Sequence, residues 1–210
     1  MLGQIVLGGL TVLFDLAPPL VMGHFLLSMA ILWDAVLLYH RAGRPDGTGA
    51  VRPVVGAPAR TLLRCVSAAA GVVVFTGTVV TAAGPHAGDA DVRRLDVAVP
   101  DVARLHGVSV FLLLALTLAA LWRMHRDRAP AAVLDAGRTL VAVLVAQAGL
   151  GYTQYFTGVP AVLVGAHVLG AVLLWVAVIR FHLAASVSLP AVPAPAERDP
   201  VLRDRTLVTP

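Results

Sequence analysis

Three histidines, His24, His106 and His167, each lie near the start of a long apolar run of this 210-residue chain. An ionisable side chain is costly inside a bilayer, so one that occurs there commonly has a functional role. Neutral imidazole is also the commonest protein ligand for metal ions. If the three runs cross a membrane in one direction, the imidazoles lie at one depth, where the helices of a bundle can hold a metal cofactor.

The apolar runs predict an all-α integral membrane protein. The chain is 58% apolar and 13% charged, and its mean hydropathy is +0.84. A run of about 18 apolar residues is long enough to cross a bilayer. The run at Leu2–Leu16 is shorter and predicts a partial or short N-terminal helix. We expect a helical bundle with five complete transmembrane helices, at Leu20–Tyr39, Leu62–Ala83, Val102–Trp122, Thr139–Phe156 and Val159–Ile179.

The charges between these runs predict the orientation. The loop after Tyr39, the loop after Trp122 and the tail are rich in arginine, whereas Gly84–Asp101 carries four aspartates. The positive-inside rule then puts the two arginine-rich loops and the tail in the cytoplasm of a multi-pass cell-membrane protein. The three histidines would lie about 6–12 Å deep from the outer ends of their helices. No basic patch with interleaved aromatics suggests a nucleic-acid partner, so membrane lipid is the expected surrounding.

Two interpretations of the three histidines differ in chemistry. A single histidine in a span is commonly bonded to a neighbouring helix and serves only packing. Three at one depth favour a cofactor, and two histidines from separate helices can ligate a heme iron axially. The remaining histidines rank lower: His40, His125 and His182 lie at cytoplasmic helix ends, and His86 lies in a turn-like outer segment.

Three arginines lie on the outer side, against the charge bias of the rest of the chain. Arg93, Arg94 and Arg104 could bind the propionates of a heme, because the guanidinium group pairs well with carboxylates. They could equally pair with the neighbouring aspartates. Arg104 is the strongest candidate, since it stands two residues before His106.

An internal repeat organises the chain. Gln147 follows Gln4 by 143 positions, and His167 follows His24 by the same 143 positions. We interpret this as a parallel duplication of a helical unit. By the same offset, the counterpart of His106 would precede Met1. Residues 1–41 are then the rear part of an incomplete first unit, 42–59 a cytoplasmic loop, 60–183 a complete four-helix heme-binding unit and 184–210 a disordered cytoplasmic tail.

Short motifs in consistent order resemble the heme A synthase family of integral membrane proteins. The resemblance extends over nearly all of residues 2–183 and rests on Gly8–Val12, His24–Ser28, Gly77–Thr81, Gly84–Asp89, Arg104–His106, Gln154–Gly158 and Gly165–His167.

The resemblance implies a fold and an activity. It implies eight helices in two four-helix halves, with heme b held in the second half by the residues that match His106 and His167. It implies that the substrate, heme O, binds in the first half, where His24 matches one of two histidines. The family oxidises a methyl group of heme O to a formyl group, giving heme A. Electrons leave through the heme b cofactor, and water is thought to supply the oxygen.

This chain departs from the family pattern at its front. The first two family helices and their outer loop, which carry the other substrate-side histidine, a glutamate implicated in catalysis and in many members a cysteine pair, have no counterpart. The catalytic residue is therefore unknown. A start site further upstream, a second polypeptide or a degenerate relative would each explain this, and we favour the first because the repeat breaks within a unit.

Two functions follow from these alternatives. The first is a heme-modifying oxidoreductase, for which a heme O synthase or the assembly of a terminal oxidase would supply partners. The second is a b-type cytochrome or heme-binding membrane protein without chemistry of its own. An upstream extension encoding two more helices, a histidine and an outer glutamate would favour the enzyme. The oligomeric state stays open.

Overall fold

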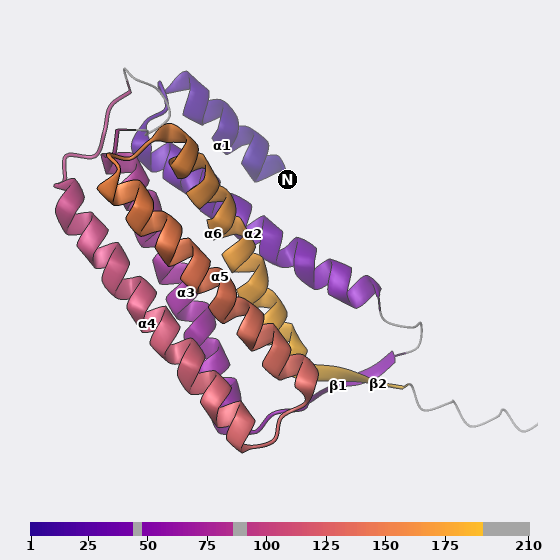
Figure 1. Cartoon of the computed structure of the whole chain (residues 1–210). Coiled ribbons are helices and arrows are strands. Elements are labelled where there is room, and N and C mark those ends of the chain that lie inside the picture. The colour runs from indigo at the N-terminus through magenta and orange to yellow at the C-terminus, as the bar shows by residue number, and fades with distance from the viewer. Residues whose placement is uncertain (44–47, 86–91, 191–210) are drawn as a thin grey trace, which may run out of the picture.

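The computed structural model describes residues 1–43, 48–85 and 92–190, and in these residues the chain is a helical bundle (Figure 1). Five helices are long and apolar enough to cross a membrane, and a sixth is short. The predicted fold class is therefore confirmed. The helices are α1 (Leu2–Leu13), α2 (Pro18–Ala42), α3 (Ala57–Ala83), α4 (Val99–Arg126), α5 (Ala131–Phe156) and α6 (Ala161–Ala184).

The helices extend beyond the apolar runs at most ends, because polar interfacial residues continue the backbone hydrogen bonding. The exceptions are the end of α1, expected at Leu16 but found at Leu13, and the start of α6, expected at Val159. Gly158 and Val159 have positive φ angles of 81° and 59°, so they form the turn that reverses the chain. Pro160 then precedes the first helical residue, Ala161.

Helices α3 to α6 form an antiparallel four-helix unit in which each helix contacts its chain neighbour and α6 contacts α3. Small residues on α3, including the buried Ala59, Ala69 and Ala70, allow close approach of the neighbouring helices. The largest side chains without exposed surface, Leu113, Met124, Leu140 and Phe181, lie away from the starts of α4 and α6. Packing is therefore tightest toward the end of the unit where α4 and α6 finish.

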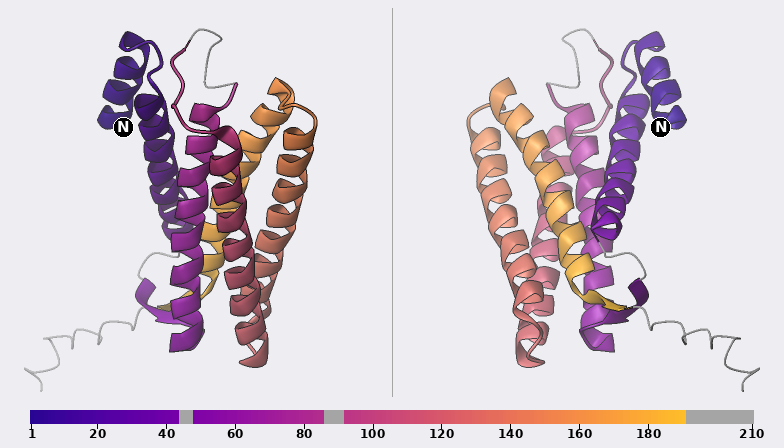
Figure 2. Two further views of the ribbon diagram at one scale, coloured as in Figure 1. Left: turned by 90° about the vertical axis from the view of Figure 1, so that its left-hand side faces the viewer. Right: turned by 90° about the vertical axis from the view of Figure 1, so that its right-hand side faces the viewer.

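The opposite end of this unit is more open. Figure 2 shows that the α3–α4 and α5–α6 hairpins diverge toward the end where α4 and α6 begin. Residues 149–173 of the second hairpin include only half-buried and exposed side chains.

Helices α1 and α2 are attached to one side of the four-helix unit. Helix α2 contacts α3 and α6, whereas α1 packs on α2. The indole Nε1 of Trp175 donates a hydrogen bond of 2.9 Å to the carbonyl of Met29, and its ring lies 5.5 Å from that of Trp33. On α2 only Pro18 and Met29 are buried. In the four-helix unit, the α3–α4 hairpin packs against the α5–α6 hairpin. Among the described residues, the α1–α2 hairpin has no second hairpin that completes a four-helix unit with it in this way.

The structure adds a small sheet that the sequence patterns did not predict. Strand β1 (Thr48–Pro53) lies in the expected loop 42–59, and β2 (Ser186–Pro190) lies at the start of the expected disordered tail. The two pair antiparallel, with Arg52 opposite Val187. The expectation of disorder from residue 184 is thus wrong for residues 186–190, because β1 supplies their backbone partners. The rest of that tail, 191–210, lies outside the described residues.

The backbone repeats the turn of the first hairpin in the third. The amide of Leu16 donates to the carbonyl of Thr11 at 2.9 Å, and the amide of Val159 donates to the carbonyl of Gln154 at 2.8 Å. Both donors have positive φ angles, as do the residues directly before them. Gln154 follows Thr11, and Val159 follows Leu16, by the same 143 positions that separate His24 from His167. The duplication seen in the side chains therefore extends to the turn geometry.

Candidate functional site

The three histidines lie at matching levels in helices that begin at the same end of the bundle (Figure 1). Each stands six or seven residues after the first residue of its helix, α2, α4 or α6. With a rise of 1.5 Å per residue, this corresponds to a depth of about 9–10 Å along each helix. The expected common depth agrees with the geometry of the helices.

His106 and His167 meet across the two hairpins of the four-helix unit. Their ring centroids are 6.5 Å apart, and the rings are inclined at 74°. With metal–nitrogen bonds of about 2 Å, two imidazoles on opposite sides of one metal ion have ring centres about 6 Å apart. The separation of these two rings therefore suits two ligands of one iron.

A glycine on the preceding helix faces each of the three imidazoles. A Cβ atom placed on Gly8 would lie 3.1 Å from Cε1 of His24, one on Gly77 would lie 3.2 Å from Cε1 of His106, and one on Gly151 would lie 3.0 Å from Cε1 of His167. Such distances are shorter than the usual carbon–carbon contact of about 3.5–4.0 Å. Each hairpin, α1–α2, α3–α4 and α5–α6, therefore repeats one arrangement in which the ring occupies the space that a side chain would fill.

The two imidazoles of the pair differ in their hydrogen bonds. Nδ1 of His106 lies 3.0 Å from Oγ1 of Thr76, which lies 3.1 Å from Oγ of Ser109. Nδ1 of His167 is buried without a hydrogen-bond partner in the described residues, and so is Oε1 of Gln154. Nδ1 of His24 and Oε1 of Gln4 are likewise buried without a partner there, so the two histidines related by the repeat share this feature and His106 differs from both.

Two glutamines related by the repeat bind the backbone beside a histidine. Nε2 of Gln147 donates to the carbonyl of His167 at 2.6 Å, and Nε2 of Gln4 donates to the carbonyl of His24 at 3.2 Å. The Gln4 amide also lies 3.2 Å from Nε2 of His24 and 2.5 Å from Oγ of Ser28. In the part of the chain that is described, His24 makes no ring contact with a second histidine.

Arg104 pairs with an aspartate, which was one of the two alternatives. Its Nη1 donates to Oδ1 of Asp101 at 3.2 Å, and the two side chains are 79% and 72% exposed. Arg94 donates to the carbonyl of Pro85, and Arg93 is exposed. A propionate contact of Arg104 stays a prediction; an exposed ion pair is weak enough to exchange partners. His86 lies outside the described residues.

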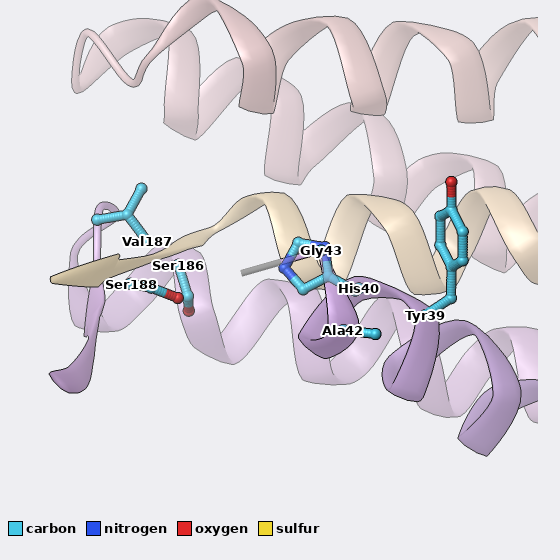
Figure 3. A pocket seen from close by; sticks show the side chains of 7 residues that line it. All are labelled: Tyr39, His40, Ala42, Gly43, Ser186, Val187 and Ser188. Atoms are coloured by element: carbon cyan, nitrogen blue, oxygen red, sulfur yellow. The ribbon is translucent and has the colours of Figure 1, made fainter. Parts of the chain in front are cut away.

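The lower-ranked histidines lie far along the helices from the pair. Nδ1 of His182 is 3.2 Å from Oγ of Ser67, and its ring packs against Trp33, so it helps to join α6 to α2 and α3. His125 is exposed. His40 contributes to a pocket between the end of α2 and β2 (Figure 3), lined by Tyr39, His40, Ala42, Gly43, Ser186, Val187 and Ser188. Because His40 stands 16 residues after His24 on α2, this pocket is about 24 Å from the histidine level.

The residues at the histidine level fit a heme better than a bare metal ion. Within residues 1–43, 48–85 and 92–190, no group of three or more His, Cys, Asp or Glu side chains is arranged to hold an ion. A heme iron needs only two axial ligands, because the porphyrin supplies the other four. The ring separation and the glycine clearances agree with that requirement.

Comparison with known proteins gives no assignment. No protein-family model, no curated protein and no solved structure matches the chain.

Sequence reasoning found the histidines but not the residues that hold them. Gly8 and Gly77 each begin one of the motifs, yet nothing in a single sequence says that a ring lies against them. Thr76 gave no signal, because hydroxyl residues are common in transmembrane helices. Each of the three hairpins carries a histidine early in its second helix. This repetition could have pointed to a glycine opposite the histidine, on the first helix of each hairpin.

Proposed function

We propose that the chain is a heme-binding membrane oxidoreductase of the heme A synthase type, with heme b held axially by His106 and His167. The single observation that supports this most strongly is the separation of 6.5 Å between the two imidazole centroids. The rings belong to different hairpins, so their approach depends on the whole four-helix unit and not on local sequence.

When bound at this position, heme b supplies one-electron redox chemistry whose potential depends on its axial ligands and their surroundings. The residues of the chain have separate roles there. His106 and His167 bind the iron, whereas Gly77 and Gly151 admit the rings close to the opposing helices. The apolar side chains of the diverging hairpins exclude water, and Arg104 lies near enough to His106 in sequence to serve a propionate.

In this proposal His24 binds the iron of the substrate, heme O, whose methyl group is oxidised to a formyl group. The repeat supports the assignment. Gly8 and Gln4 contact the ring and the carbonyl of His24, as Gly151 and Gln147 contact those of His167. The proposed site lies at the histidine level of the α1–α2 hairpin. The same proposal places both hemes near the outer face and the tail in the cytoplasm. It also includes partners in heme biosynthesis and in oxidase assembly.

A second function, a b-type cytochrome without chemistry of its own, is favoured by one observation. His24 has no second histidine against its ring in the described residues, and its Nε2 is already in contact with the Gln4 amide. On this alternative the α3–α6 unit binds heme b, while α1–α2 has no substrate.

Heme binding is tested with three alanine variants. We expect the purified protein to show the absorption spectrum of a low-spin heme with two histidine ligands. His106→Ala and His167→Ala should each lose that spectrum, because one axial ligand is gone. His24→Ala is the matched control, since it removes the same side chain at the same depth, and it should keep the spectrum. A low-spin spectrum that persists in both of the first two variants would refute the assignment.

The two functions are then separated in cells. Heme extracted from cells with and without the gene is analysed by chromatography for heme O and heme A. The oxidoreductase predicts that heme A depends on the gene and that His24→Ala causes heme O to accumulate. If the b-type spectrum is present but the ratio of heme A to heme O does not change, the cytochrome function is supported instead.

A further inference from the structure

The hydroxyl of Thr76 lies at the centre of a small buried network behind His106. It is within 2.9 Å of the Val72 carbonyl, 3.0 Å of His106 Nδ1 and 3.1 Å of Ser109 Oγ. Thr76 and Ser109 are each 7% exposed, so water does not compete for these atoms. The directions of the hydrogen bonds can therefore be worked out from the few protons available.

A threonine hydroxyl has one proton to donate and can accept from others. The Val72 carbonyl can only accept, so a hydrogen bond to it uses the Thr76 proton. Ser109 in turn donates to the carbonyl of His106 at 2.7 Å, which uses the serine proton. With both hydroxyl protons used, the contact between His106 Nδ1 and Thr76 Oγ1 is a hydrogen bond only if Nδ1 carries a proton and donates it to Oγ1, and the 3.1 Å contact between Thr76 and Ser109 then carries no proton.

The opposite tautomer leaves the network incomplete. If Nδ1 were unprotonated, Thr76 would have to donate to it and would lose its bond to the carbonyl of Val72. The Val72 carbonyl keeps its backbone hydrogen bond within α3, so the cost is that of one lost hydrogen bond, about 0.5–1.5 kcal/mol. The network thus favours the tautomer in which Nδ1 is protonated and Nε2 carries the free lone pair.

We propose that Thr76 is the positioning residue that fixes the tautomer and the ring orientation of His106. This inference rests on the proposed function, because a bare Nε2 is the form that can bind iron. A histidine ligand almost always donates its other ring N–H to a protein acceptor, which also raises its basicity. His167 has no such acceptor in the described residues, so the two axial ligands are inequivalent.

The first test reads the tautomer without heme. Full-length protein labelled with 15N-histidine is prepared heme-free, and the ring nitrogens of His106 are assigned with His106→Ala. In the wild type, Nδ1 should show the shift of a protonated nitrogen and Nε2 that of an unprotonated one. Thr76→Val keeps the shape but removes the acceptor, so the signal should move toward a mixture of tautomers. Thr76→Ser restores the hydroxyl and should restore the wild-type pattern.

The matched control is Thr78→Val. Thr78 is also buried on α3, 8% exposed, but its hydroxyl donates to the carbonyl of Phe75 and not to a histidine. Thr78→Val removes a hydroxyl from the same helix, two residues from Thr76. A general disturbance of α3 caused by Thr76→Val should therefore also appear in Thr78→Val. If Thr76→Val leaves the His106 shifts at their wild-type values, or if Thr78→Val changes them equally, the role of Thr76 is overturned.

The second test uses the heme-loaded protein. Loss of such a hydrogen-bond partner typically weakens metal affinity about 10- to 100-fold. We expect Thr76→Val to weaken heme binding by that amount and to raise the reduction potential, because a less basic imidazole stabilises ferric iron less. Thr76→Ser and Thr78→Val should stay near the wild type. If the wild type binds no heme, the proposed function fails while the heme-free test still decides the tautomer.

Discussion

The closest contact between a glycine and a histidine gives the sharpest prediction. A methyl group on Gly151 would lie 3.0 Å from Cε1 and 3.5 Å from Nδ1 of His167. Normal carbon–carbon contact is about 3.5–4.0 Å, so in Gly151→Ala the ring must retreat by about 0.5–1 Å. A metal–ligand bond tolerates a change of only about 0.2 Å. The ring cannot both clear the methyl group and keep its place beside His106 unless the helices move.

The size of the effect follows from the cost of overpacking. Inserting a methyl group into a filled space typically costs about 1–3 kcal/mol. If that cost falls on the heme-bound state, in which the ring is held in place, the affinity for heme decreases about 5- to 150-fold. The heme-free protein can turn the His167 ring away, so its folding should be affected less.

The assay compares heme affinity among matched variants. Gly149→Ala is the control, because a Cβ atom there would have no atom within 4 Å and the residue lies on the same helix two positions earlier. Both substitutions replace glycine by alanine within α5, so their effect on helix propensity is the same. Each purified protein is freed of heme, titrated with hemin and followed by the low-spin absorption band. Thermal denaturation of the heme-free proteins in detergent checks the fold.

The outcomes separate ligand displacement from general damage. We expect Gly149→Ala to bind heme as the wild type does and Gly151→Ala to bind it much more weakly, with similar denaturation midpoints. Equal heme affinities for the two variants would refute the reasoning that His167 is held against Gly151. A large fall in the denaturation midpoint of Gly151→Ala alone would assign the loss to the hairpin itself.

Two further predictions concern the bundle and its orientation. Phe181 has no exposed surface, so Phe181→Ala should cost about 3–5 kcal/mol and lower the denaturation midpoint in detergent strongly, whereas the same change at the 78% exposed Phe156 should not. The orientation is tested with single cysteines in a Cys65→Ser background. A cysteine placed at Asp96 should react with a membrane-impermeant thiol reagent in intact cells, and one placed at Asp127 should react only after permeabilisation. The reverse pattern would contradict the predicted orientation.

The sequence predicted the number of spans because a bilayer requires long apolar helices, and apolar length is visible in the residues. It could not predict how the hairpins diverge. Small residues are buried along most of α3, from Ala59 and Ala70 to Ala82 and Ala83, so their positions in the sequence do not indicate where the hairpins diverge. It also did not predict β1 and β2, because Ser186–Pro190 resembles a polar tail until Arg52 and its neighbours supply a partner strand.

The candidate site was predictable to the extent that histidine is rare in apolar helices. The pairing of His106 with His167 follows from the family resemblance and not from helix direction, because His24 also falls early in a helix of the same direction. The partners could not be predicted for a physical reason. Whether Thr76 or Val73 faces His106 depends on the rotation of α3 about its axis, and single-sequence patterns of small and apolar residues do not fix that rotation.

The repeat also explains how one arrangement could serve two uses. Gln4 and Gln147 both bind the carbonyl of the histidine opposite, but only the Gln4 amide also contacts the imidazole Nε2, at 3.2 Å from His24. The amide nitrogen has two protons and three acceptors within reach, namely Nε2 of His24, the His24 carbonyl and Oγ of Ser28, so Nε2 shares the amide with two other groups. Such a contact contributes about 1 kcal/mol at most, which an iron–imidazole bond readily replaces. We therefore expect iron to bind His24 in competition with Gln4, whereas in the described residues no side-chain amide contacts the rings of His106 and His167.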